Sequence, residues 1–279
     1  MKGWLRRLAT APLDRVRARS HRMVHLVPPS GVGIGNILYI LLEAHRVRLD
    51  GREGLATRTA ALEPWLDVFP GLAELVIGRR EMRLTDARRH GWFQQFESFE
   101  SVLDSFIQER MLTAPQWPGV AHDVGTVTVN VRRGDYYAVR EFRELYGFNI
   151  AEYVRLALAG SAAQAPITSV RVVSDDIDWC KQHLGFVKEY GHPMWQSPGD
   201  GPVQNLLDLA RSRRLVLANS TFSYWGGYMS SVAHGDNHEL IWAPGFHTRT
   251  YGDEVVAWQL DPRWTIVNQI PGGWGEPDE

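Results

Sequence analysis

Three clusters of polar residues in the second half of the chain have the side chains that bind phosphate or stabilise negative charge. The first runs from Asn130 to Tyr136 and contains Arg132 and Arg133, and a guanidinium group grips phosphate through two parallel hydrogen bonds. The second is Ser174-Asp175-Asp176, and the third is Asn219-Ser220-Thr221-Phe222-Ser223 ahead of a predicted helix. Hydroxyls and free N–H groups at a helix start can hold an anion. Together the clusters predict an anion-binding site, provided that the fold brings them together.

Each cluster also has a purely structural explanation, which stays open at this point. Successive residues of a strand point to opposite faces, so only one of the two arginines is expected to face the site. The alternative is an arginine that pairs with Asp135 or Asp175. The hydroxyl cluster is equally typical of an ordinary helix cap. Asp175 and Asp176 favour a helix cap over a metal site, because two carboxylates without a third acid or a histidine make a poor metal cage.

The elements that would position these clusters alternate between strands and helices. Alternating or continuous apolar residues predict strands over residues 126–131, 169–173, 186–190, 215–218 and 239–242, the last of them being the final strand. Helical spacing predicts helices over 150–159, from 177 to about 185, 203–213 and 222–233. This order indicates a parallel sheet of Rossmann type. Ligands bind at the carboxyl ends of such strands, where the three clusters fall.

The first half of the chain gives a weaker signal. Residues 23–27 predict a buried strand, a glycine-rich loop follows at 31–35, and a helix is expected from Asn36 to about His45. Residues 51–64 are mixed, residues 79–90 are interpreted as an arginine-rich solvated face, and residues 92–112 predict an amphipathic helix. The prolines and glycines of residues 113–125 predict a boundary between domains 1–118 and 119–279.

Composition and charge exclude several classes of protein. The net charge is −2, from 30 basic and 32 acidic residues, so no global field favours nucleic acid. A single cysteine, Cys180, excludes a disulfide framework and a cysteine-based metal site. No apolar run reaches the roughly 18 residues that cross a bilayer. Residues 1–22 form a basic arm, and either contact with an anionic membrane surface or a solvated or packed arm explains it.

The glycine-rich loop permits a second class of enzyme. Gly31-x-Gly33-x-Gly35 after a strand, with Asp50 further on, resembles part of a dinucleotide fingerprint. The strict pattern would need a glycine at Asn36, so it fails. A nucleotide-dependent oxidoreductase therefore stays open as one function for this loop.

Four motifs in order resemble those of fucosyltransferases, most closely the α-1,2-fucosyltransferases of glycosyltransferase family 11. Gly33-Ile34-Gly35-Asn36 matches the family's Gly-x-Gly-Asn loop, and the segment from Asn130 to Tyr136 matches its His-x-Arg-Arg-x-Asp-Tyr motif. Residues 174–180 match Ser-Asp-Asp-x-x-Trp-Cys. Residues 219–225 match Asn-Ser-Thr-Phe-Ser-Trp-Trp, with Tyr224 in place of one tryptophan.

The resemblance implies a GT-B-like α/β fold, with two Rossmann-like domains facing across a cleft. Domain 1–118 would be the acceptor side, and domain 119–279 would bind the nucleotide sugar. It implies an inverting transfer from GDP-fucose to a glycan or glycolipid hydroxyl that needs no metal or other cofactor. Arg132 would hold the donor diphosphate, Asp208 would read guanine and Ser223 would touch phosphate. The full set of expected donor-binding residues is Gly33, Gly35, Asn36, Asn130, Arg132, Arg133, Ser174, Asp175, Asp176, Asp208, Asn219, Ser220, Thr221 and Ser223.

Two departures from the family pattern affect these expectations. Asn130 stands where the family has histidine, so one donor contact differs and the donor sugar is fucose or a related sugar. Ile37, Leu38 and Tyr39 replace the usual residues after the Gly-Asn step. Arg132, Glu141 and Asp135 are the catalytic candidates, and Glu141 is the expected base among the acids Asp135, Glu141 and Glu144 that follow the arginines. The expected protein is bacterial and cytoplasmic, with the basic arm as its membrane contact, and a non-catalytic homologue that binds glycan or nucleotide is the remaining alternative.

Overall fold

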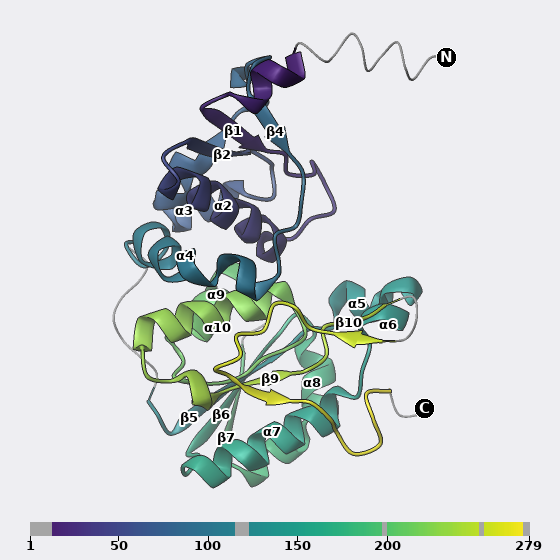
Figure 1. Cartoon of the computed structure of the whole chain (residues 1–279). Coiled ribbons are helices and arrows are strands. Elements are labelled where there is room, and N and C mark those ends of the chain that lie inside the picture. Colours follow the sequence, from purple (N-terminus) through teal and green to yellow (C-terminus); the bar gives the residue numbers. More distant parts are fainter. Residues whose placement is uncertain (1–12, 115–122, 197–199, 251–253, 276–279) are drawn as a thin grey trace. The chain divides into compact units, whose positions relative to one another are not determined.

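The computed structural model describes residues 13–114, 123–196, 200–250 and 254–275 (Figure 1). The chain divides into two compact units, Met1–Gln116 and Trp117–Glu279. The sequence placed the division at 118/119, inside the stretch 115–122 that lies outside the described residues. Within the described parts, no helix is long and apolar enough to cross a membrane.

The first unit is built on a four-stranded parallel sheet in the order β3-β2-β1-β4. Its strands are β1 (Arg22–His25), β2 (Glu53–Thr57), β3 (Val76–Ile77) and β4 (Ala87–Arg89). Its helices are α2 (Ile34–Leu49), α3 (Glu63–Val68), η1 (Pro70–Leu75), η2 (Arg79–Glu81) and α4 (Phe96–Arg110). Most residues of α2 are buried, and most of these are apolar. In α4 only one face is buried, which includes Phe96, Phe99, Val102 and Leu103.

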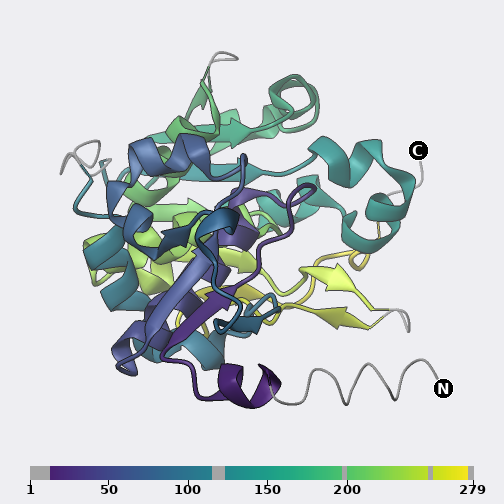
Figure 2. The ribbon, with the colours of Figure 1, turned by 90° about the horizontal axis from the view of Figure 1, so that it is seen from above.

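The second unit has a six-stranded parallel sheet in the order β12-β9-β8-β5-β6-β7. Its strands are β5 (Thr126–Val131), β6 (Ser169–Ser174), β7 (His192–Trp195), β8 (Arg214–Val216), β9 (Ile241–Pro244) and β12 (Thr265–Val267). Read from β7, this is the doubly wound 3-2-1-4-5-6 order, whose direction of winding reverses between β5 and β8. The predicted parallel α/β sheet is confirmed. Figure 2 shows the same ribbon turned by 90°, seen from above.

The helices of the second unit connect these strands and cover the sheet. They are α5 (Gly134–Ala138), α6 (Arg140–Tyr146), α7 (Ile150–Gln164), α8 (Ile177–His183), η3 (Gly185–Glu189), α9 (Pro202–Arg211), α10 (Thr221–His234) and η4 (His238–Leu240). The main core joins the buried valines of β5 and β6 to the buried face of α7, which includes Tyr153, Val154 and Leu158. A small hairpin, β10 (Thr248–Arg249) with β11 (Val255–Val256), follows β9.

Several sequence predictions are wrong where strands are short. Residues 186–190 form most of η3 rather than a strand, and the strand beside β6 is β7, a few residues later. The strand at 239–242 is not the last, because β12 pairs with β9 beyond it. In the first unit, β2 lies in the mixed stretch 51–64 and β4 lies within 79–90, and neither strand was expected. The interpretation of 79–90 as a solvated face is confirmed for its five arginines, all of which are exposed. Elements this short depend on their neighbours rather than on their own pattern.

Candidate functional site

The loops after β5 and β8 meet at the point where the winding of the second sheet reverses. A small pocket there is lined from one side by Asn130, Val131 and Arg132 and from the other by Ala218 and Asn219. The residues come from different strands, and the parallel sheet brings their carboxyl ends together. The structure therefore joins the first and third polar clusters of the sequence, at the place where doubly wound sheets bind ligands.

Arg132 is held at this edge by two carboxylates. Its Nη1 donates to Oδ2 of Asp175 and its Nη2 to Oδ1 of Asp135, each at 2.5 Å. The side chain is 35% exposed, so the guanidinium is oriented by its partners yet open to solvent. The pairing that the sequence left as the structural alternative is thus present, and anion binding by Arg132 stays a prediction.

Arg133 has a different environment, as expected for adjacent residues. Its guanidinium lies between the rings of Tyr137 and Trp179, 4.0 and 4.1 Å from their centroids. Its Nε donates to Oδ2 of Asp176 at 3.2 Å. Arg133 therefore packs the loop against α8, and of the two arginines Arg132 is the one that lines the pocket.

Gly134 follows the arginines where a larger residue would disturb them. Its φ is +20°, and a Cβ atom would lie 2.5 Å from Oδ2 of Asp175, the atom that accepts from Arg132. Oδ1 of the same carboxylate accepts from the N–H of Arg133 at 2.8 Å. The glycine in this motif is therefore required by the close approach of the Asp175 carboxylate.

We expect Gly134→Ala to lower the melting temperature by about 2–4 °C, because a strained, crowded alanine costs about 1 kcal/mol in a chain of this size. Turnover should fall as well, since Asp175 is pushed from Arg132. The matched control is Gly185→Ala, where a Cβ would meet open space. Thermal melting and donor turnover of both variants check this; equal values for the two would contradict it.

The Ser174-Asp175-Asp176 cluster serves the loops and the start of α8. Asp176 caps α8, because its Oδ1 accepts from the N–H of Trp179 at 3.2 Å. The Ser174 hydroxyl accepts from the N–H of Asp176 at 3.0 Å. Across the described ranges, no group of three or more potential metal ligands gathers. The helix-cap explanation is confirmed for Asp176, while Asp175 holds Arg132.

Asn130, Asn219 and Ser223 are buried and already hydrogen bonded. Asn130 Nδ2 donates to the carbonyl of Val173 at 3.0 Å, and Asn219 Nδ2 donates to the carbonyl of Tyr146 at 2.8 Å. The Ser223 hydroxyl accepts from the N–H of Ala218 at 2.9 Å. These three residues shape the pocket and the turn after β8.

Ser220 and Thr221 stand at the start of α10. Ser220 is the N-cap residue but makes no side-chain cap, and neither hydroxyl has a partner among the described residues. Of the third cluster, these hydroxyls are therefore the ones available to a ligand, together with the amino end of a 14-residue helix.

Asp208 lies on the buried face of α9 and not in the pocket lining. Its Oδ1 accepts from Gln204 Nε2 at 2.7 Å, and its Oδ2 is 3.9 Å from Nη1 of Arg171. A carboxylate has about four acceptor sites, so two hydrogen bonds from guanine remain compatible with these partners. Guanine recognition by Asp208 stays a prediction.

The base candidates differ in their surroundings. Asp135 is engaged with Arg132, and Glu144 accepts from Arg140 Nε at 3.0 Å. Glu141 is exposed on α6, and its side chain makes no hydrogen bond or ion pair within the described ranges. Glu141 therefore stays the candidate base.

Sequence reasoning missed two amide side chains at the carboxyl edge of the sheet. Gln196, directly after β7, accepts from the N–H of Ser174 at 3.0 Å through Oε1 and donates to Oδ1 of Asn205. Gln196 and Asn205 thus connect the end of β6 to α9. No local signal marks them, because β7 was not expected at this position.

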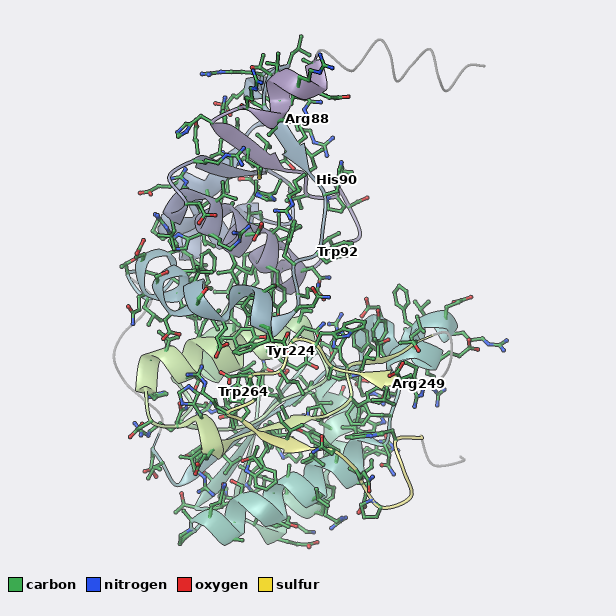
Figure 3. All side chains as sticks on the ribbon, in the orientation of Figure 1. Arg88, His90, Trp92, Tyr224, Arg249 and Trp264 are labelled. Carbon is green, nitrogen blue, oxygen red and sulfur yellow. The ribbon has the colours of Figure 1, made fainter. Side chains whose placement is uncertain are left out.

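Buried titratable groups around the pocket are held neutral. Burial raises the pKa of the Tyr153 hydroxyl, which donates to the carbonyl of Leu217 at 2.9 Å beneath the pocket. Burial lowers the pKa of His247, which contacts Tyr224 (labelled in Figure 3), to about 4. Burial also raises the pKa of the Cys180 thiol to about 12, so it is not a nucleophile at neutral pH.

The glycine-rich loop belongs to the first unit. Gly33 precedes α2 as its N-cap residue, Gly35 lies in the first turn, and Oδ1 of Asn36 accepts from Gln94 Nε2 at 2.8 Å. The part of these three residues in donor binding stays a prediction. Asp50 caps the opposite end of α2, a helix of 16 residues and therefore about 24 Å long, so it cannot serve that loop as the acid of a dinucleotide fingerprint.

The fold and the pocket define the second unit as a doubly wound α/β domain with cationic and hydroxyl groups at its switch point. Residues 89–236 match the family model described as glycosyl transferase family 11, and the chain belongs to this family. The matched stretch contains β5 to β8 and all three polar clusters. The resemblance drawn from the four motifs is thereby confirmed at the level of the family.

Two curated relatives from Escherichia coli are similar to part of the chain. An "Alpha-1,2-colitosyltransferase" is 24% identical over 124 residues, which cover 44% of this chain and 43% of the relative. An "O-antigen biosynthesis glycosyltransferase WbnK" is 20% identical over 112 residues, covering 40% and 37%. The matches thus span less than half the length of these relatives.

Solved structures with some similarity include POFUT1 in complex with GDP, at 16% identity and a TM-score of 0.37, covering 85% of this chain and 77% of that one. POFUT1 in complex with GDP-fucose matches at 14% identity with a TM-score of 0.36. A likeness of this size does not establish an activity.

Proposed function

We propose that this protein is an inverting glycosyltransferase that transfers L-fucose or a related sugar from a GDP-sugar to a glycan hydroxyl. The carrying observation is Arg132, a solvent-open guanidinium fixed by two carboxylates at the switch point of a family 11 domain. The oxidoreductase alternative is not favoured, because Asp50 lies at the wrong end of α2. Donor turnover distinguishes the enzyme from a homologue that only binds.

The proposed reaction places charge where the pocket can stabilise it. The acceptor oxygen forms a bond to the anomeric carbon while the bond from that carbon to the diphosphate oxygen breaks, and GDP leaves from the opposite face. The electrons of the broken bond stay on the diphosphate, and the acceptor's proton goes to a base, with Glu141 as the candidate. Arg132 exchanges its carboxylate partners for the diphosphate and stabilises its growing charge.

A donor screen tests the proposal directly. Release of GDP or UDP is measured from GDP-fucose, GDP-colitose, GDP-mannose and UDP-sugars with a glycan acceptor, because one relative is named for transfer of colitose. We expect turnover of a GDP-sugar and not of UDP-sugars. Turnover of UDP-sugars alone would contradict the proposal, and Asn130 is the residue to exchange for histidine if the donor is not GDP-fucose.

We expect GDP to bind equally well with and without divalent metal, within about twofold. The charge on the diphosphate is met by a guanidinium in this proposal, and a charge-assisted hydrogen bond needs no metal. Isothermal titration in EDTA and in magnesium or manganese measures this. Binding that appears only with metal would show that the site is completed by a cation.

The basic arm is proposed as a peripheral contact of a cytoplasmic enzyme with an anionic membrane surface. Residues 1–12 lie outside the described residues, whereas Arg17 donates to the carbonyl of Leu84 at 2.9 Å and Arg22 pairs with Glu53 at 3.3 Å. Arg17 and Arg22 therefore contact the first unit, which leaves Lys2, Arg6, Arg7 and the exposed Arg15 and Arg19 for lipid.

Deleting residues 1–12 should weaken binding to anionic vesicles about 100-fold at low salt, since it removes Lys2, Arg6 and Arg7 and each basic residue near such a surface contributes about 1 kcal/mol. The melting temperature and turnover of a soluble acceptor should not change. Vesicle sedimentation at low and high salt beside thermal melting measures both. Unchanged vesicle binding with a lower melting temperature would show instead that these residues are packed.

A further inference from the structure

The outer strand of the first sheet carries a row of exposed side chains. Arg88 lies in β4, and His90 and Trp92 follow at every second position, so the three lie on one side of the extended chain. Figure 3 shows them one after another along the same side of this unit. The indole of Trp92 is 50% exposed, which is high for the largest apolar side chain.

Arg88 and His90 of this row line a hollow of about 520 Å³, within the usual range for ligand sites, and Trp92 follows two residues after His90. Leu26, Val27 and Pro28, which follow β1, form its apolar part, and Arg79, Arg88 and His90 form its polar part. The strand order β3-β2-β1-β4 reverses direction between β1 and β4, so the hollow lies at the switch point of the first sheet.

The two arginines of the hollow are not neutralised. Within the described ranges, the side chains of Arg79 and Arg88 make no hydrogen bond or ion pair. Arg89, on the opposite side of β4, pairs with the buried Glu43 at 2.8 Å. The nearby acids are engaged elsewhere, because Glu81 accepts from the N–H of Gly78 and Asp86 from the N–H of Arg83. The hollow is therefore cationic, with guanidinium forks open to an anion.

We propose that this hollow binds the acceptor and that the acceptor is a saccharide bearing an anionic group, either a carboxylate or a phosphate. Arg79 and Arg88 bind the anion, and the exposed indole of Trp92 stacks on the C–H face of a neighbouring sugar ring. That the bound saccharide is the acceptor rests on the proposed transferase function. The binding of an anionic saccharide is measurable without any transfer.

The test is isothermal titration of the full chain with four probes: a glucuronate-terminated disaccharide, its glucose-terminated counterpart, a phosphorylated disaccharide and inorganic phosphate. At least one anionic disaccharide should bind about tenfold more tightly than the neutral one. The carboxylate and phosphate probes identify which anion is recognised. Equal affinity for neutral and anionic disaccharides would overturn the proposal.

Variants connect the binding to these residues. Arg88→Ala and Arg79→Ala should each remove most of the preference for the anion, whereas Arg80→Ala, an exposed arginine of the same 3₁₀ turn outside the hollow, should not. Trp92→Ala should lower the affinity for the disaccharides and leave the affinity for inorganic phosphate unchanged. A loss in Arg80→Ala equal to that in Arg88→Ala would show general charge attraction instead of a site.

The two proposals fail separately. Transfer to a neutral acceptor with a KM that Arg88→Ala does not change would refute the anionic acceptor and keep the transferase. Tight binding of the anionic disaccharide without turnover of any GDP-sugar would refute the transferase and keep the site.

Discussion

Arg132→Ala is expected to reduce transfer about 10- to 150-fold with the fold intact, the equivalent of one charge-assisted hydrogen bond of about 1.5–3 kcal/mol. The loss is larger if the interaction strengthens as the diphosphate leaves. Arg132 is 35% exposed and its neighbours are carboxylates that solvent also reaches, so its removal leaves no buried charge unpaired. Turnover measured beside thermal melting separates the effect on catalysis from an effect on stability.

Two further variants sharpen this result. Arg132→Lys should restore little activity, because lysine lacks the planar fork that binds two oxygens at once. Arg213→Ala is the control, since Arg213 pairs with Asp236 just ahead of β8, at the amino edge of the sheet opposite the pocket. Near-normal turnover in Arg132→Ala would remove Arg132 from the proposed mechanism.

Asp208→Ala is expected to lower the affinity for GDP about 10- to 100-fold and to narrow the difference between the affinities for GDP and UDP. A carboxylate accepts two hydrogen bonds from the N1–H and N2 amino edge of guanine, which uracil does not present, and a site built on such bonds rejects a ligand that lacks them. Because Arg171 lies 3.9 Å from Asp208, the variant also loses a neighbouring charge and should melt at a lower temperature.

The ratio of affinities separates these two effects. A general loss of stability weakens GDP and UDP alike, whereas loss of guanine recognition weakens GDP alone. Gln204→Ala is the matched control, since it removes the hydrogen bond to Asp208 but keeps the carboxylate. An unchanged ratio of GDP to UDP affinity in Asp208→Ala would show that Asp208 serves only the packing of α9 against β6.

The sequence by itself determined the strands β5, β6 and β8, the helices α7 to α10 and the position of the three polar clusters in the second unit. Two of the signals are local: the strict alternation of residues in 126–131, and the helix-start residues Asp176 and Ser220. Such signals can be recognised without knowledge of the fold. Because ends of parallel strands share an edge, the topology alone brought Asn130, Arg132 and Asn219 to one pocket.

The tertiary structure alone decided what those residues do. Two arginines adjacent in the sequence have opposite roles, because Asp175 draws Arg132 to the pocket while Tyr137 and Trp179 enclose Arg133. Neither contact has a signature in the spacing of the chain, since the partners lie on other elements.

The short strands of the first sheet were also decided by tertiary structure. β2, β3 and β4 have five residues or fewer, and their hydrogen bonds come from strands distant in the chain. Because these neighbours stabilise the strands, their own residues need not show a clear alternation of apolar and polar side chains. The arginines of 79–90 are exposed, as the sequence predicted, but the strand within this stretch was missed. Pairing of β4 with β1 places Arg89 against Glu43 and Arg88 beside an open hollow.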